Sequence, residues 1–433
     1  MDEKKAKPRH NVSFPVFSVL LLVALISSLV LAGNPSVQAA KGSVEKGPIR
    51  IGVVLPLSGA AAESGQNLLK GFSLYMDEIH HKMSGRPVEL LVENTESSPA
   101  TAVAKFHKLI DQEKVPLLAG IYLSSELYAV APVADAGKTP FLVMSAGADN
   151  VTQRKNSHWI VRTCYTGSIM AHPLGEYAYK TLGYKRIITL VNDYAYGYEV
   201  VGGFQRSFEQ AGGKIVQKLW TPLGFTDFSE TIKSMRKDAD AVFMANVGQC
   251  AEIIPKQYHE LGPKLPLLGN HTSFDDSVLP KVGEYVLGAQ GVSTYATAIN
   301  TPANKRFVKA YKQKYGVDPS LYAANGYLAA MWLGKAIDSI KGTVEDKEKL
   351  MEALREIELK DAPHGPISLD QYGQAVSNVY LYKVVKNGNQ YENKIVHTFP
   401  AVSQFWTYNA TQYMKDPPYT KDYPPCKYCT PAK

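Results

Sequence analysis

The stretch IRIGVVLPLSGAAAESGQNLLKGFSLYMDEI, residues 49–79, decides the fold of this chain. Its first part, Ile51 to Leu57, is rich in β-branched residues and too short for a helix, which is typical of a buried parallel strand. Its last part has one apolar helix face, formed at steps of three and four by Leu68, Phe72, Tyr75 and Ile79. The Ser-Gly-rich segment 58–65 joins the two parts. Because ligands of open parallel sheets lie at the carboxyl ends of the strands, we expect this segment to border a ligand site.

The same alternation of apolar strand and amphipathic helix continues along the chain and then restarts. A first series has strands in PVELLVENT, VPLLAGI and TPFLVMSAG, with helices at about 98–113 and 125–136. A second series begins beyond residue 163, with strands in RIITLV, KIVQKL, DAVFMAN and LPLLGN, and ends in a hairpin around Asn387-Gly388. A chain of 433 residues is also longer than one hydrophobic core usually serves. We therefore predict an α/β fold with two doubly wound parallel-sheet lobes.

The N-terminus is predicted to be a secretory signal peptide that covers residues 1–39. Four basic residues precede an apolar run from Val16 to Ala32, and Val37 and Ala39 occupy the small-residue positions of a cleavage site. The alternative is an uncleaved anchor, because the apolar run approaches the length of a membrane-spanning helix. No cysteine stands at the cleavage region, which argues against a lipid anchor, and no paired arginines precede the run, which argues against twin-arginine export. We therefore expect a periplasmic protein exported by the Sec route.

Composition argues against several kinds of partner and cofactor. The net charge of +7 is mild, and no basic run is interleaved with aromatic residues, so nucleic-acid binding is not expected. No motif typical of a metal or cofactor site is present, and none is predicted. Cys426 and Cys429 lie in the Tyr- and Pro-rich tail 401–433, which we expect to be extended from Ser403. Because no strand precedes the pair and no helix follows it, we predict a disulfide or a surface metal pair there rather than a redox motif.

Six motifs occur along the chain in the order IGVVLPLSGAAAESG, AGIYLSSE, MSAGADN, VRT, NDYAYG and GPISLDQYGQ. In this order they resemble the periplasmic solute-binding proteins of ABC importers, in particular the type I group of leucine/isoleucine/valine-binding proteins. The resemblance implies two lobes joined by three crossovers, which close around a small solute and deliver it to membrane permease subunits without any catalysis. Lobe 1 is predicted at 48–163 and 292–376, and lobe 2 at 164–291 and 377–400. The protein is expected to act as a monomer.

The resemblance also implies a ligand site in lobe 1. Ser124 corresponds to the serine whose hydroxyl binds the carboxylate of the ligand, although Ser124 or Ser125 would alternatively serve only as a helix cap. Gly147 corresponds to the residue whose backbone carbonyl accepts a hydrogen bond from the ammonium group of the ligand. Asp149 stands where the family has a carboxylate-binding threonine, and a second carboxylate at that place would repel the first. Its alternative role is to cap the turn that begins near Asn150.

The resemblance further implies one matching contact in lobe 2, and three more positions depart from the family. Tyr196 corresponds to the tyrosine that contacts the ligand, with its neighbours Tyr194 and Tyr198 as alternatives. Ser64, in lobe 1, stands where the family has a cleft tyrosine, and a second family tyrosine falls near Val247 or Gly248. His271 stands where the family has the acidic residue that binds the ammonium group, and loss of such a charged partner costs several kcal/mol.

These departures leave two kinds of ligand open. An amino acid of the branched-chain type is favoured by the resemblance, and its ammonium would then need Asp149, Asp275 or Asp276 as a partner. Alternatively, His271 donates to a carboxylate that arrives without any ammonium, and the ligand is an aromatic or aliphatic acid.

Two other classes of protein fit less well. A periplasmic hydrolase would need a nucleophile elbow or a metal-binding helix, and neither G-x-S-x-G nor H-E-x-x-H is present. A sensor would use the same fold to signal to a receptor or kinase instead of a transporter, and the sequence alone does not separate it from a transport component.

Overall fold

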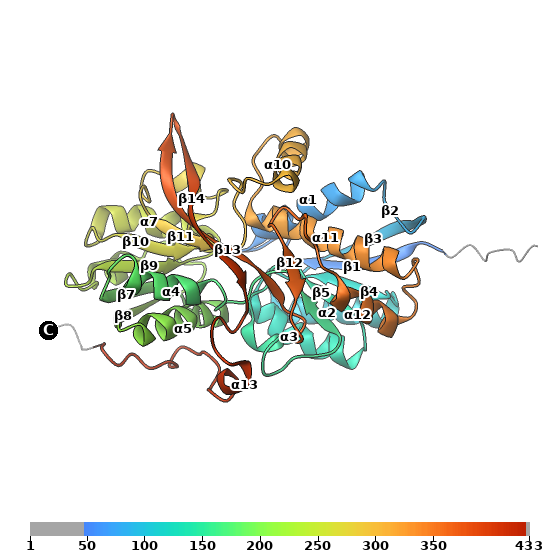
Figure 1. Ribbon diagram of the computed structural model, residues 1–433, viewed down its shortest axis with the longest axis horizontal. Helices are drawn as coiled ribbons and strands as arrows, with labels where there is room; N and C mark the ends of the chain where they lie inside the picture. Colours follow the sequence, from blue (N-terminus) through green and yellow to red (C-terminus); the bar gives the residue numbers. More distant parts are fainter. Residues whose placement is uncertain (1–46, 430–433) are drawn as a thin grey trace, which may run out of the picture. The chain divides into compact units, whose positions relative to one another are not determined.

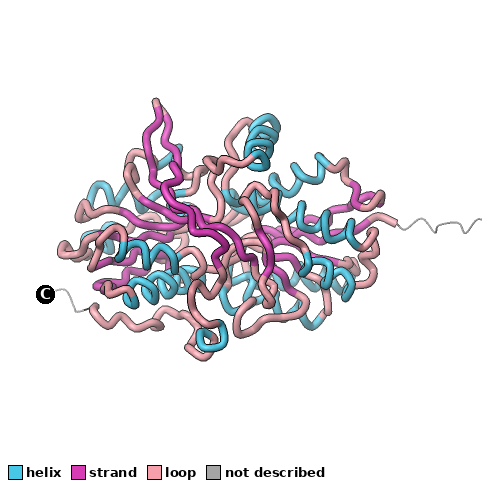
Figure 2. Tube along the Cα trace, in the orientation of Figure 1, coloured by secondary structure: helices cyan, strands magenta, loops and turns pink. Residues whose placement is uncertain are grey.

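The apolar strands pair into two sheets in the computed structural model, which describes residues 47–429 (Figures 1 and 2). The predicted signal peptide lies outside the described residues. In the first sheet, β1 (Ile49–Leu55) runs parallel to β3 (Arg86–Asn94) on one side and to β4 (Leu117–Gly120) on the other. The order of its six strands is β2-β3-β1-β4-β5-β6. The remaining strands are β2 (Lys82–Met83), β5 (Phe141–Val143) and β6 (Ile160–Arg162).

Helices cover both faces of this sheet, which explains why its strands are apolar at almost every position. Ile51 and Val53 of β1 belong to a cluster with α1 and α11, whereas Val54 belongs to a cluster with α2 and α3. All three side chains are fully buried. The helices associated with this sheet are α1 (Ala62–Glu78), α2 (Pro99–His107), α3 (Ser124–Ala136), α10 (Pro302–Tyr315), α11 (Leu321–Ser339) and α12 (Lys347–Glu356).

The second sheet has eight strands in the order β12-β13-β11-β10-β9-β7-β8, with β14 paired to β13. Its parallel strands are β7 (Arg186–Asn192), β8 (Lys214–Thr221), β9 (Ala241–Ala245), β10 (Leu267–Asn270) and β11 (Gln290–Ser293). Its antiparallel strands are β12 (Ile367–Leu369), β13 (Ala375–Asn387) and β14 (Gln390–Val402). Its helices are α4 (Ala171–Lys180), α5 (Ala195–Gln210), α6 (Ser229–Lys233), α7 (Gln249–Leu261), α8 (His271–Phe274) and α9 (Leu279–Val282).

Both sheets reverse their winding at one point, and this places the ligand site. The chain runs from β1 to β3 on one side and then returns to β4 on the other side of β1. In the second sheet it runs from β7 to β8 and then returns to β9 in the same way. Ligands of doubly wound sheets lie at the carboxyl ends of the strands that flank such a point. The predicted fold class of two doubly wound sheets is confirmed.

Several local expectations were incomplete or wrong. The tail is not extended throughout, because it contains the helix α13 (Ala410–Tyr413) and packs along α5. The helix expected at 98–113 ends at His107 and continues as a π-helical turn, 108–112. The predicted hairpin is present, with the two-residue loop Gly388-Asn389.

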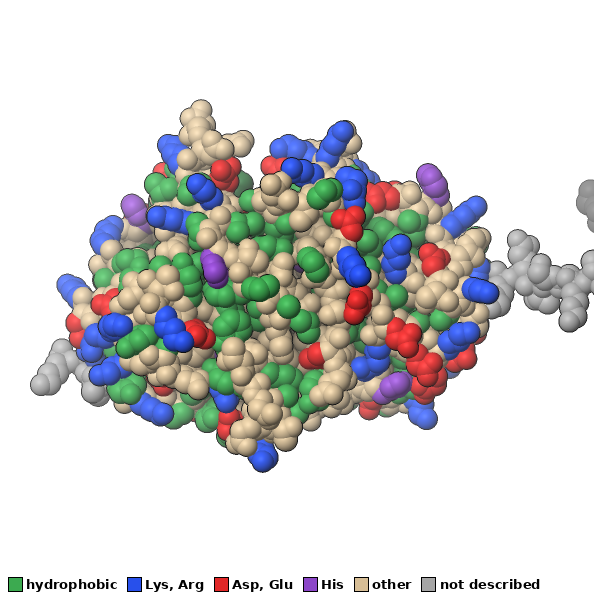
Figure 3. Space-filling model, in the orientation of Figure 1, with side chains coloured by type: hydrophobic (Ala, Val, Ile, Leu, Met, Phe, Trp, Pro, Cys, Tyr) green, Lys and Arg blue, Asp and Glu red, His purple; other side chains and the backbone are tan. Residues whose placement is uncertain are grey.

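No helix within residues 47–429 is long and apolar enough to cross a membrane. Acidic and basic side chains are interspersed over the face seen in Figure 3.

Candidate functional site

Ser124 lies at the start of α3, at the carboxyl end of β4 beside the reversal point of the first sheet. Its side chain is 1% exposed, and its Oγ accepts a hydrogen bond from the backbone N–H of Ala148 at 2.9 Å. Its partner is therefore the neighbouring loop and not its own helix. Since the hydroxyl acts as acceptor in that bond, its proton is available for a ligand. Ser125 is half-buried and lines neither of the two cavities described below.

The loop Ser145–Asp149 follows β5 and borders the same space. The Gly147 carbonyl accepts from the backbone N–H of Gly167 at 3.0 Å and from Arg162 Nη1 at 2.9 Å. A carbonyl oxygen has two lone pairs, so both are engaged. The same Arg162 nitrogen also donates to the carbonyls of Ala146 and Ala148, at 3.1 and 2.9 Å. The loop is therefore held from behind by a fully buried guanidinium group.

Asp149 is placed on the far side of this loop. Its Oδ1 accepts from the backbone N–H of Ser168 at 3.1 Å, and its backbone N–H donates to Glu199 Oε1 at 3.0 Å. It lines neither cavity. Burial raises the pKa of Asp149, while hydrogen bonds from Ser168 and the charge of Arg162 partly oppose that rise. The structure thus directs the Asp149 carboxyl away from the position that the resemblance implied.

Tyr196 enters from the second sheet, in the first turn of α5 after β7. Its hydroxyl accepts from Asn270 Nδ2 at 2.9 Å, and its ring packs on Gly147. A Cβ atom on that glycine would lie 2.5 Å from Tyr196 Cδ2, so only glycine allows this approach. Tyr194 lines the same cavity, whereas Tyr198 turns away and donates to Asp193 at 2.5 Å.

His271 is fully buried at the carboxyl end of β10. Its ring centroid lies 4.4 Å from that of Tyr165 and 6.0 Å from that of Tyr322. Burial lowers its pKa to about 3, so the imidazole is neutral at ordinary pH. Within the described chain neither of its ring nitrogens has a hydrogen-bond partner.

Two adjoining cavities separate the two sheets at this place. The smaller one holds about 10 Å³, room for about one water molecule, and is lined by Ser124, Ser145, Gly147, Tyr196 and their neighbours. The larger one holds about 460 Å³, within the usual range of small-molecule sites, and its walls include Ser64, Gly248 and His271. Thr272 lines both. Between them the hydroxyl groups of Tyr122 and Tyr322 approach to 3.2 Å.

The acidic groups around the larger cavity are already engaged. Glu63 and Glu252 both pair with Lys281, at 3.3 and 2.7 Å. Asp275 accepts from the backbone N–H groups of Ser277 and Leu321, both at 3.0 Å. Asp276 does not line the cavity.

Sequence reasoning missed several groups that shape this site. Tyr122 lies two residues after the end of β4, so its place near a strand end was a usable signal. Tyr165 and Tyr322 come from a crossover and from the start of α11, and only the tertiary fold brings them to His271. Arg162 and Asn270 position other residues and have no sequence signature of that role.

Comparison with known proteins agrees with this fold. A family model described as periplasmic binding protein matches residues 48–389. A Leu/Ile/Val-binding protein homologue of Brucella abortus is 29% identical over 361 residues, which are 81% of this chain and 91% of that protein. An ABC transporter substrate-binding protein from Sphaerobacter thermophilus has a TM-score of 0.78 at 33% identity, over 82% of this chain and 99% of that one. A solute-binding protein from Rhodopseudomonas palustris, solved with 3,4-dihydroxybenzoic acid, has a TM-score of 0.78 at 29% identity, over 82% and 98%.

Proposed function

The chain belongs to the periplasmic binding proteins of the Leu/Ile/Val-binding type, the solute-binding components of ABC transporters, and we propose that its solute is a small carboxylic acid without an ammonium group, in the first place an aromatic acid. The family assignment makes it a binding protein and not an enzyme. We further propose that it works outside the cytoplasm and passes its solute to permease subunits after the two lobes close around it.

The observation that carries the proposal is the state of the possible ammonium acceptors. Both lone pairs of the Gly147 carbonyl are engaged, and a neutral histidine stands where the family has an acid. Among the described residues, the three acids on the larger cavity already accept hydrogen bonds from Lys281 or from backbone groups. A buried ammonium group would therefore have to compete with these donors for a carboxylate, and a buried charge left without its own partner costs several kcal/mol.

A carboxylate, in contrast, has a suitable place. The Ser124 hydroxyl retains its proton, and the first N–H groups of α3 have no intrahelical acceptor. The Arg162 guanidinium lies directly behind the adjoining loop and adds positive charge. Four tyrosine rings line the same small cavity, so an aromatic ligand that widens this cavity would lie against aromatic side chains.

A ligand panel tests the proposal. Purified protein is titrated by calorimetry with benzoate, 4-hydroxybenzoate, 3,4-dihydroxybenzoate, leucine, isoleucine and valine, and its melting temperature is measured with each. We expect at least one aromatic acid to bind with one-to-one stoichiometry and to raise the melting temperature, because a ligand that binds the folded state stabilises it by mass action. Tighter binding of any branched-chain amino acid than of every aromatic acid would overturn the proposal and favour the amino-acid alternative.

A further inference from the structure

His271 is a buried polar side chain whose hydrogen-bonding capacity is unused. Throughout residues 47–429 no donor or acceptor contacts either ring nitrogen, although the side chain is fully buried at the wall of the larger cavity. Buried polar groups are nearly always hydrogen-bonded, and each one left without a partner is destabilising. A ligand in the cavity is therefore a natural source of the missing partner.

The protonation state of His271 restricts what that partner is. A neutral imidazole offers one donor and one acceptor. A carboxylate has acceptors only and an ammonium group has donors only, so each of them matches one nitrogen at most. A hydroxyl group is both donor and acceptor and is compatible with either nitrogen of the ring.

Tyr165 provides a measure of the distance between His271 and the carboxylate site. Its hydroxyl lies 3.1 Å from Ser145 Oγ, which lines the small cavity with Ser124. Its ring lies against His271 at 4.4 Å between centroids. One phenol side chain thus extends from the carboxylate site to His271, and a benzoate-sized ligand that lies along Tyr165 has the same length.

We propose that His271 selects ligands that carry a hydroxyl group on the aromatic ring, on the side away from the carboxylate. This inference rests on the proposed function, because it assumes an aromatic acid with its carboxylate at Ser124. It makes His271 a specificity-determining residue that recognises a neutral group, not the charge-bearing partner of a carboxylate.

The test compares a matched pair of ligands in a set of variants. Dissociation constants of benzoate and 4-hydroxybenzoate are measured by calorimetry for the wild type, for His271→Phe and for His271→Gln. We expect the wild type to prefer the hydroxylated acid by about tenfold, because a polar site left unpaired discriminates against the analogue that lacks the hydroxyl. In His271→Phe the ratio should fall close to one, and His271→Gln, which keeps a donor and an acceptor, should retain part of the preference.

Two results would overturn this inference: a wild type without preference for 4-hydroxybenzoate, or a ratio that is the same in His271→Phe as in the wild type. If no aromatic acid binds the wild type at all, the proposed function itself fails. Thermal unfolding of each variant verifies that it is folded, and the ratio within one variant does not depend on its overall affinity.

A second inference comes from residues 403–429, which we name the strap. The strap lies beyond the matched family region, which ends at residue 389. On the side of the first sheet, Arg154 donates from Nε to the carbonyl of Asp416 at 3.1 Å and from Nη2 to the carbonyl of Tyr413 at 2.9 Å. Gln404 Nε2 donates to the carbonyl of Thr152 at 3.1 Å. Both anchors belong to the segment that directly follows the Ser145–Asp149 loop.

The strap is also attached to the second sheet. Arg206 of α5 pairs with Asp416 at 2.9 Å and lies 4.5 Å from the ring centroids of both Tyr408 and Tyr413. Lys421 pairs with Asp193 at 2.6 Å.

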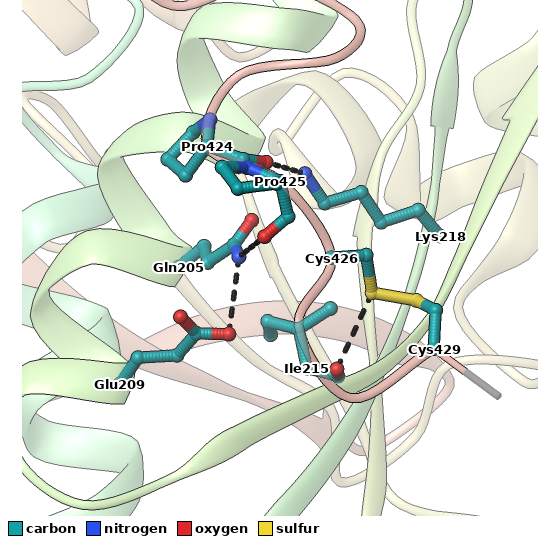
Figure 4. The surroundings of a disulfide bond; sticks show 8 residues. All are labelled: Gln205, Glu209, Ile215, Lys218, Pro424, Pro425, Cys426 and Cys429. Carbon is teal, nitrogen blue, oxygen red and sulfur yellow. Dashed lines mark hydrogen bonds between the residues drawn. A yellow bond between two sulfur atoms is a disulfide. The ribbon is translucent and has the colours of Figure 1, made fainter.

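The last part of the strap is fixed beside β8 (Figure 4). Gln205 Nε2 donates to the Pro425 carbonyl at 2.9 Å, and Lys218 Nζ donates to the Pro424 carbonyl at 2.5 Å. Cys426 and Cys429 form a disulfide there, which answers the alternatives that the sequence left open. The Cys426 sulfur lies 3.4 Å from the Ile215 carbonyl oxygen.

We infer that the strap is a conformational latch that favours the closed arrangement of the two sheets. In this arrangement the two sheets are in direct contact beside the small cavity, because the Asp149 N–H donates to Glu199 and Tyr196 packs on Gly147, and the strap bonds both sheets. Contacts made in only one of two states shift the equilibrium towards that state. The strap therefore raises the affinity for solute and slows its exchange.

Small-angle scattering without solute tests the latch. The wild type is compared with Arg154→Ala and with a chain that ends at Val402. We expect a larger radius of gyration in both variants. We also expect both variants to bind the best ligand of the panel about tenfold more weakly, because losing one hydrogen bond to a charged group has about this effect. The control is Arg306→Ala, which removes an exposed ion pair with Asp361 away from both the strap and the cleft. If the shortened chain fails to fold, the Arg154→Ala variant alone decides the test. A radius of gyration and an affinity equal to those of the wild type in Arg154→Ala would overturn the latch.

Discussion

The two sides of the Ser145–Asp149 loop carry opposite kinds of polar group. On the cleft side lie hydroxyl groups and a neutral imidazole, from Ser124, Ser145 and His271. On the strap side lie two buried carboxyl groups, Asp149 and Glu199, each 2% exposed. Burial raises the pKa of both, and the neighbouring Asp149 raises that of Glu199 further.

Arg162 lies between these two sides and hydrogen-bonds the loop itself. At an effective dielectric constant near 20, two unit charges about 4 Å apart interact by about 4 kcal/mol, so the placement of these few groups matters for any charged ligand. Asp149 and Glu199 are held behind the loop, whereas Ser124 and Ser145 present hydroxyl groups on the cleft side. The acids of the larger cavity already accept from Lys281 or from backbone groups. The arrangement of charge around one loop therefore favours an anion over a zwitterion with an ammonium group.

The largest loss of ligand affinity is expected from Gly147→Ala, which fills the space between the Ser145–Asp149 loop and the ring of Tyr196. The new methyl group would lie 2.5 Å from a ring carbon of Tyr196, so the loop or the tyrosine must move. Overpacking of this kind costs about 1–3 kcal/mol, and we expect the affinity for the best aromatic acid to fall by up to about 100-fold in calorimetry. Gly47→Ala is the control, because nothing lies within 4 Å of its added Cβ. An affinity close to that of the wild type would show that the Tyr196 contact is not part of the binding site.

A loss of affinity of similar order is expected from Ser124→Ala, which removes the proton donor on the cleft side. Loss of a hydrogen bond to a charged ligand group costs about 1.5–3 kcal/mol, so the dissociation constant should rise by about 10- to 100-fold. Ser125→Ala should change it little, because Ser125 lines neither cavity. The pair of variants resolves an alternative that the sequence left open. Equal losses in both would mean that the carboxylate contacts the helix start in another way.

The fold was predictable because its signals are local. Strands such as 49–55 are short and apolar, the intervening helices have one apolar face, and the order of the two kinds implies parallel sheets. The helix caps were equally local, and Ser98 accepts from Thr101 N as its position before a proline predicted. The helix α12 was missed although its signals are local, with Asp346 as N-cap and one apolar face, whereas the folding of the strap onto α5 depends on long-range packing.

The site was predictable only as a set of positions, not as chemistry. Strand ends and the family resemblance pointed to Ser124, Gly147, Tyr196 and His271, and all four lie around the two cavities. What the sequence could not show is which atoms are already engaged. The carbonyl of Gly147 is occupied by Arg162, 15 residues away in sequence, and the Asp149 carboxyl turns to the opposite side. Both facts depend on the tertiary arrangement, and both change the expected ligand.

The smallest expected effect is a change in the pH dependence of the free energy of unfolding. It comes from Glu199, one of the two acids on the strap side. Burial raises the pKa of Glu199 in the folded state above its value in the unfolded chain. The stability that the protonated Glu199 contributes is therefore fully present below about pH 4.3, the unfolded pKa. It is lost as the pH rises through the folded pKa. Glu199→Gln removes this titration. The variant should therefore gain stability over the wild type as the pH rises, by at most about 1.4 kcal/mol per pH unit.

Urea unfolding of both proteins at about pH 4.5, 6 and 7.5 measures the difference at each pH. Comparison with the wild type cancels the titrating groups that do not interact with Glu199, and Glu230→Gln, at a side chain that is 92% exposed, controls for loss of one negative charge. A stability difference that does not depend on pH would mean that Glu199 stays ionised when folded. The strap side would then hold a full negative charge next to Asp149, and the separation of charge across the loop would be larger than the raised pKa values imply.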